Sequence, residues 1–141
     1  MRVILGSDHA GYERKAELRA ALEADGHEVT DVGCHSTDSC DYPDLAHAVA
    51  RAVAAGEADR GLLVCGSGAG VAMAANRHAG VRAVQAWSEE IARLSREHND
   101  ANVATFGARL QSADEIVQIA RAWLAAEFAG GRHTPRVAKI G

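Results

Sequence analysis

The chain has 141 residues, 48% of them hydrophobic and 24% charged, so it can form one domain around a real hydrophobic core. Its formal net charge of −4 argues against a nucleic-acid-binding protein, although a local pocket for a small anion stays compatible with it. The short apolar N-terminus and the lack of a long apolar run argue against a signal peptide and a membrane span, so we expect a cytoplasmic protein.

Short apolar runs alternate with helical patterns along the whole chain. In chain order these patterns predict a strand at 2–5, a helix at 12–25, a strand at 28–32, a helix near 44–55, a strand at 61–65, a helix near 69–78, a strand at 82–86, a helix at 88–98, a strand at 102–106 and a helix at 112–128. Turn-forming residues separate the strands from the helices.

The first and last helices are the most clearly bounded. The first carries Leu18 and Leu22 inward and stops at Gly26, the residue type that most easily adopts a left-handed helix end. In the last helix, Ser112 and Glu115 fit a capping box. Its apolar stripe has helical spacing and consists of Ile116, Ile119, Ala120, Trp123 and Leu124.

The alternation predicts an α/β fold, a three-layer αβα sandwich around a five-stranded parallel sheet. We expect the flavodoxin-like or Rossmann-like strand order 2-1-3-4-5. No linker, repeat or low-complexity segment interrupts the pattern, so residues 1–141 are expected to form a single domain in which 130–141 are a C-terminal tail.

Unusual residues follow three of the predicted strands. In open parallel sheets, ligands bind beyond the carboxyl ends of the strands, where the winding reverses. The first strand leads into Asp8 and His9, the third into Cys65 and Ser67, and the fifth into Arg109. We therefore expect these side chains to share one edge of the sheet.

The segment CGSGAG (65–70) carries the clearest chemical signal. Its glycines expose backbone N–H groups at the start of a helix, where negative charge is favoured. The spacing fits neither G-x-G-x-x-G nor a P-loop. The segment is thus either a structural turn or a cradle for an anion or oxyanion. Cys65 is correspondingly either a small core residue or a thiolate base.

Three cysteines are an odd number, which argues against a disulfide framework in a chain without a secretory signal. Cys34 and Cys40 could be combined with His35 and His47 into a zinc site, but their spacing matches no common zinc pattern. We expect neither arrangement.

Most of the seven histidines have simple interpretations as surface or turn residues: His27, His35, His47 and His78. His9 and His98 are either structural or general acid–base groups. Arg132 and Arg136, four residues apart in the tail, form either a solvated basic end or a pair of guanidiniums that fold back onto a phosphate.

The sequence resembles the B-type ribose-5-phosphate isomerases, a family that includes galactose-6-phosphate isomerase subunits. The matching stretches are GSDHAGYERK (6–15), DYPDLA (41–46), CGSGAGVAMAANR (65–77), SREHNDANVATFGAR (95–109) and GGRHTPRV (130–137). The resemblance implies interconversion of ribose 5-phosphate and ribulose 5-phosphate through a cis-enediol, with no cofactor and no metal. It also implies a homodimer, or a tetramer built from dimers, whose active sites draw on both subunits.

The resemblance further implies a role for individual residues. Cys65 would move a proton between C1 and C2, and His98, held by Asp8, would open the furanose ring. Ser67 and the N–H groups around it would stabilise the enediolate, namely those of Gly66, Gly68, Ala69 and Gly70. Tyr42 and Asn99 would contact the sugar. The phosphate would be held by His9, Arg109, Arg132 and Arg136.

Two positions depart from the family pattern. Val71 stands where some members have a glutamate base, which leaves Cys65 as the only credible base in this loop. Ser67 replaces a threonine that many relatives carry, and it keeps the hydroxyl. The loop at 33–40 is the expected place where substrate length is judged. The alternatives are therefore an isomerase of allose 6-phosphate, galactose 6-phosphate or a tetrulose phosphate, and a nucleotide- or flavin-binding module.

Overall fold

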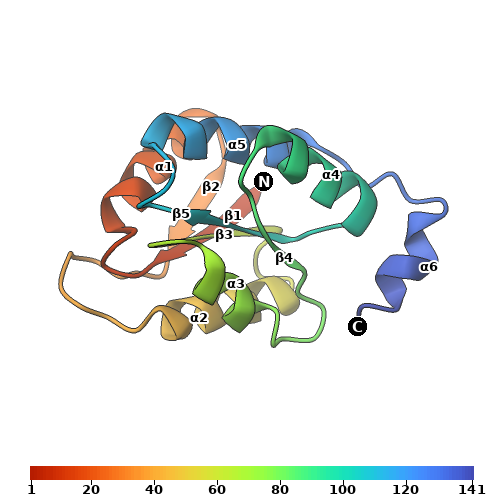
Figure 1. Cartoon of the computed structure of the whole chain (residues 1–141), viewed down its shortest axis with the longest axis horizontal. Helices are drawn as coiled ribbons and strands as arrows, with labels where there is room; N and C mark the ends of the chain where they lie inside the picture. The colour runs from red at the N-terminus through yellow and green to blue at the C-terminus, as the bar shows by residue number, and fades with distance from the viewer.

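The computed structural model describes residues 1–141 and confirms the predicted α/β sandwich (Figure 1). Its parallel strands are β1 (Arg2–Ser7), β2 (Glu28–Asp31), β3 (Arg60–Cys65), β4 (Ala83–Gln85) and β5 (Val103–Gly107). Its helices are α1 (Tyr12–Ala24), α2 (Tyr42–Ala54), α3 (Ala69–Ala75), α4 (Glu89–Asn99), α5 (Ala113–Ala125) and α6 (His133–Ala138). The last of these is a short helix within residues 130–141, which we expected to form a C-terminal tail.

The strand order is β2-β1-β3-β5-β4, which corrects the predicted order 2-1-3-4-5. Burial explains the exchange of the last two strands. All five residues of β5 are buried, whereas the three residues of β4 are only partly buried. The more apolar strand therefore lies beside β3, in register from Gly61 with Val103 to Cys65 with Gly107, and the short strand forms the edge.

In this order β3 lies between β1 and β5, and the connection that leaves β3 crosses the face of the sheet opposite to the connections that leave its two neighbours. The chain turns back after β4, so α4 joins α1 and α5 on one face of the sheet, while α2 and α3 cover the other (Figure 1). The helices that follow β1 and β5 thus lie on the face opposite α3. The loop after Cys65 consequently borders a crevice on both of its sides.

The core has two parts, one on each face of the sheet. Trp123 and Phe106 are buried on the face covered by α1, α4 and α5, and Val49 and Leu63 are buried beneath α2 and α3. The apolar side chains predicted to point inward from the first and last helices are all buried. The capping box at Ser112 is formed, which confirms the predicted start of α5.

Two sequence expectations about side-chain pairing are wrong. Cys34 and Cys40 form a disulfide, because the loop between β2 and α2 folds back on itself and brings the two sulfurs together. Neither sulfur is then free to bind zinc, and no three His, Cys, Asp or Glu side chains are grouped closely enough to hold a metal ion. His47 and His78 are not separate surface residues, because their rings meet with Nδ1 and Nε2 2.7 Å apart.

No helix combines the length and apolarity needed to cross a membrane.

Candidate active site

A cavity of about 400 Å³, the carboxyl-edge cavity, opens where β1, β3 and β5 end. Its lining consists of Asp8, Tyr42, Cys65, Gly66, Ser67, Gly70, Arg109 and Leu110. Seven of these eight are residues that the sequence singled out. Leu110 is the addition, and its apolar side chain gave no chemical signal in the sequence.

Cys65 is the last residue of β3 and lines the cavity although it is only 5% exposed. Its Sγ accepts the backbone N–H of Gly68 at 3.1 Å. An N–H group aimed at sulfur stabilises the negative charge that a thiolate base carries. Cys65 is also the only cysteine outside the disulfide. Cys65 thus borders the cavity, and its sulfur is oriented by the loop that follows it.

The glycines of the loop at 65–70 allow a tight turn and a close approach. Gly68 has a φ of +82°, in the left-handed region, and a Cβ there would lie 3.0 Å from the carbonyl carbon of Phe106. Its carbonyl oxygen accepts the Thr105 hydroxyl at 2.7 Å, which ties the loop to β5. A Cβ at Gly70 would collide with the ring of Tyr42. Glycine therefore lets the backbone turn around the sulfur and lets Tyr42 lie against the loop.

Arg109 and Asp8 flank Cys65 from the two neighbouring strands. The Arg109 N–H donates to the Gly66 carbonyl at 3.1 Å, and its exposed guanidinium lies over Gly66 without an ion-pair partner. Asp8 is buried, and its Oδ1 accepts the N–H of Gly11 at 3.0 Å. A fixed carboxylate and a free cation thus stand on opposite sides of one sulfur, an arrangement that can orient a small polar anion.

His9 lies just outside this lining, next to Asp8. Its ring Nδ1 accepts the backbone N–H of Cys40 at 3.3 Å, which connects it to the disulfide loop. The predicted placement of His9 at the carboxyl edge is therefore confirmed, and its contact with Cys40 is a feature that the sequence did not reveal.

Four predicted site residues lie elsewhere: His98, Asn99, Arg132 and Arg136. His98 and Asn99 end α4 just before β5 begins, which places them at the opposite, amino edge of the sheet. His98 stacks on His133 of α6, with ring centroids 4.4 Å apart. In Figure 1 this end of α4 and α6 are at the far right, and the loop at 33–41 is at the far left. One chain therefore does not bring His98 to Cys65.

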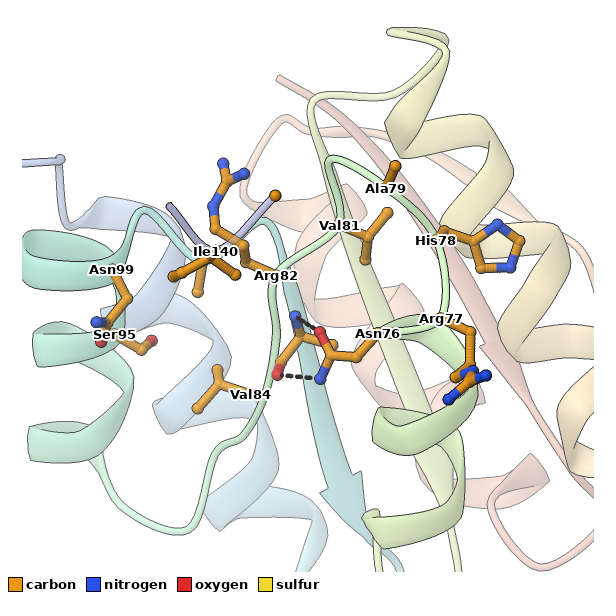
Figure 2. Close-up of a pocket in the computed structure, with 13 residues that line it drawn as sticks. Asn76, Arg77, His78, Ala79, Val81, Arg82, Val84, Ser95, Asn99 and Ile140 are labelled. Carbon is orange, nitrogen blue, oxygen red and sulfur yellow. Dashed lines mark hydrogen bonds between the residues drawn. The ribbon is translucent and has the colours of Figure 1, made fainter. Parts of the chain in front are cut away.

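A second and larger cavity of about 650 Å³, the amino-edge cavity, lies beside these residues (Figure 2). Asn99 and Ser95 of α4 approach it from one side, and Asn76 at the end of α3 approaches it from the other. The Asn76 side chain both donates to and accepts from the backbone of Ala83, at 2.9 and 2.7 Å, and so joins α3 to β4. The amino-edge cavity contains no thiol.

Comparison with known proteins decides the family. The model of the Ribose/Galactose Isomerase family matches residues 3–140. Ribose-5-phosphate isomerase B of Escherichia coli K12 is 46% identical over 139 residues, which cover 99% of this chain and 93% of that protein. The chain belongs to the Ribose/Galactose Isomerase family. It is an aldose–ketose isomerase.

Two solved structures and one further relative are similar to this isomerase over nearly the whole chain. Clostridium thermocellum ribose-5-phosphate isomerase B is 48% identical, covers 100% of this chain and 95% of its own, and superposes with a TM-score of 0.98. The Mycoplasma genitalium enzyme with bound ribulose-5-phosphate is 38% identical, covers 98% and 92%, and has a TM-score of 0.93. A D-erythrulose-4-phosphate isomerase of Pectobacterium atrosepticum is 37% identical and covers 100% and 93%.

Proposed function

We propose that this isomerase interconverts ribose 5-phosphate and ribulose 5-phosphate through a cis-enediolate, with Cys65 as the base. The observation that carries the proposal is Cys65, which lines the carboxyl-edge cavity and whose sulfur accepts the Gly68 N–H. The Escherichia coli, Clostridium and Mycoplasma relatives named for ribose 5-phosphate support this choice of sugar.

The proton transfer follows from this geometry. In the open-chain aldose, the Cys65 thiolate removes the proton from C2, and the electron pair of that bond forms the C1–C2 double bond while charge develops on O1. Ser67 Oγ accepts the Ala69 N–H at 3.2 Å, so its own proton is free to stabilise that oxygen and to pass between O1 and O2. The thiol then returns its proton to C1, and the ketose forms. One base serves both carbons because they are adjacent.

Arg109 supplies positive charge at the rim of the cavity. Its guanidinium has no ion-pair partner within the chain and lies over Gly66, next to the cavity. We assign it, together with His9, to the substrate phosphate. Gripping the phosphate places C1 and C2 against the sulfur, so binding at one end of the sugar accelerates chemistry at the other.

The residues at the amino edge complete the site only if a second copy supplies them. We propose a homodimer in which His98, Asn99, Arg132 and Arg136 of one copy reach the carboxyl-edge cavity of the other. Large apolar side chains exposed on elements next to the edge strand β4 support such an interface: Met73, Trp87, Ile91 and Leu110. His98 would then open the sugar ring as an acid, with the buried Asp8 holding it.

A second candidate is a four-carbon substrate, favoured by the Pectobacterium relative that is named for D-erythrulose 4-phosphate. The two candidates share the chemistry at C1 and C2. They differ in the distance from C1 to the phosphate and in ring opening, which only the five-carbon sugar needs. The nucleotide- or flavin-binding alternative loses its support, since the family match covers nearly the whole chain.

A substrate panel tests the proposal. We would measure kcat/KM for ribose 5-phosphate, erythrulose 4-phosphate, allose 6-phosphate and galactose 6-phosphate under the same conditions. We expect ribose 5-phosphate to exceed each of the others by about tenfold or more, because one CHOH group more or fewer misplaces the phosphate relative to the sulfur. A higher kcat/KM for any other sugar would replace ribose 5-phosphate as the substrate.

A further inference from the structure

The loop between β2 and α2, residues 33–41, contains two cysteines that the proposed reaction does not use. Cys34 and Cys40, six positions apart, are joined by the disulfide and close a small ring of backbone. The loop ends at α2, whose first residue, Tyr42, lines the carboxyl-edge cavity. The disulfide therefore lies in the segment that leads directly into the site.

The Cys34 end of this ring is firmly anchored. Lys15 is 1% exposed, and its Nζ donates to Asp31 Oδ1 at 2.8 Å and to the Cys34 carbonyl at 2.6 Å. The Cys34 N–H donates to the Ser7 carbonyl at 2.7 Å, and the Ser7 N–H donates to Gly33 at 2.8 Å. Cys34 is thus fixed to the end of β1, one residue before Asp8.

The Cys40 end meets His9. The Cys40 N–H donates to His9 Nδ1 at 3.3 Å. A backbone N–H can only donate, so Nδ1 must be the acceptor, and the neutral imidazole then carries its proton on Nε2. The disulfide links Cys40 to the anchored Cys34 and so limits the positions that the Cys40 N–H can occupy.

We propose that the Cys34–Cys40 disulfide is a redox-dependent positioning device that holds His9 in its Nε2–H form and thereby raises affinity for the phosphorylated substrate. The part that concerns substrate rests on the proposed function, and the part that concerns the His9 ring does not. A small dithiol opens the device by thiol–disulfide exchange: it gives two electrons and two protons, Cys34 and Cys40 become thiols, and the dithiol becomes a cyclic disulfide. A disulfide of the oxidised-glutathione class reverses the step and is itself reduced to two thiols.

Counting thiols is the first test. In protein lysed and denatured in the presence of an alkylating agent without reductant, one thiol should react, that of Cys65, and the thiols of Cys34 and Cys40 should react only after reduction and a second alkylation. Three reactive thiols before reduction would overturn the proposal, because the disulfide would then not form.

Kinetics of ribose 5-phosphate isomerisation is the second test. Reduction should raise KM by about 3- to 10-fold, the effect of one lost hydrogen bond, while kcat changes by less than about twofold. The C34S/C40S double variant should have the raised KM with or without reductant, which separates the disulfide from any effect on Cys65.

Ser36→Ala, which removes only a bond to the Asp38 N–H within the same loop, should keep the redox response. His9→Asn should lose that response. A KM unchanged by reduction, or a response that persists in His9→Asn, would overturn the proposal.

Nitrogen-15 NMR of the His9 ring is the third test and needs no turnover. The oxidised, substrate-free protein should show one tautomer, with the proton on Nε2, and the reduced protein should show a mixture of both. If no sugar phosphate is converted but the His9 spectrum responds to reduction, the proposed function fails and the positioning of His9 stands. A His9 spectrum that reduction leaves unchanged overturns the positioning itself.

Discussion

The two edges of the sheet are built in different ways. At the carboxyl edge, Cys65 and its neighbours are fixed by backbone hydrogen bonds between strand ends, such as those from Ala108 and Arg109 to Cys65 and Gly66. At the amino edge, His98 is held by stacking on His133, and α6 has no buried residue. Arg132 and Arg136 are exposed there and have no ion-pair partner within the chain.

The difference shows which part of the proposed site a single chain can preorganise. Parallel strands place their carboxyl ends side by side, so Cys65 and the N–H donors beside it are in position before any substrate binds. The amino-edge residues have the chemistry of a phosphate and sugar site but no cavity with a thiol beside them. They are the half of the site that we assign to the neighbouring copy.

Removing the base gives the largest expected effect. Cys65→Ala should lower kcat roughly a hundred- to ten-thousandfold, because general base catalysis is typically worth that much. Cys65→Ser, which keeps the shape of the side chain but not its acidity, should lose a comparable amount. Steady-state rates with ribose 5-phosphate check both variants, and full activity in Cys65→Ala would end the role that we assign to the sulfur.

Mixing two inactive variants tests directly whether one active site combines residues from two copies of the chain. If each site combines Cys65 of one copy with His98 of another, then Cys65→Ala mixed with His98→Asn should recover about a quarter of wild-type activity, since half of the dimers are hybrids with one intact site. The matched control, Cys65→Ala mixed with Ser67→Ala, should recover nothing, because both changes lie at the same edge. No recovery in the first mixture, once hybrid dimers have formed, would show that His98 of a neighbouring copy does not act at Cys65.

Arg132, which precedes α6, and Arg136 within it should affect binding more than stability. Arg132→Ala and Arg136→Ala should each raise KM about 10- to 100-fold, the worth of a hydrogen bond to a charged group, and leave the melting temperature nearly unchanged. Lys139→Ala, another exposed cation at the end of α6, serves as the control and should behave like wild type. Unaltered KM values in both arginine variants would remove them from the phosphate site.

The smallest effect is a pH dependence of stability near the amino-edge cavity, which His78 lines. Burial, followed by the nearby His47 and Arg51, lowers the pKa of His78 below its ordinary value of 6.5. The unfolded chain therefore binds a proton at His78 at a higher pH than the folded chain does. The contribution of His78 to stability is complete above pH 6.5 and is lost as the pH falls through the lowered folded-state pKa.

Melting temperatures measured between pH 7.5 and 5.5 test this sign. The wild-type melting temperature should fall on acidification, and His78→Asn should show a flatter profile. His35→Asn, at an exposed position outside the histidine pair, should keep the wild-type slope. A wild-type profile that rises towards acid pH would contradict the assignment.

Much of the fold could be predicted because its signals are local. The strands and helices are short-range patterns of apolar spacing, turns and caps, and Ser112 and Gly26 mark helix ends in the sequence as they do in the structure. The positions of Cys65, Ser67 and Arg109 followed from the rule that chemistry gathers where parallel strands end. That rule needs only the strand boundaries.

What the sequence determined by itself is therefore the α/β sandwich, the family and the residues to which we assign the chemistry. Only the tertiary structure decided that β5 rather than β4 borders β3, that Cys34 reaches Cys40, and that His98 lies away from Cys65. Each of these depends on the relative burial of distant segments and on which edge of the sheet a residue occupies. Such quantities belong to the whole chain packed together, and no local pattern encodes them.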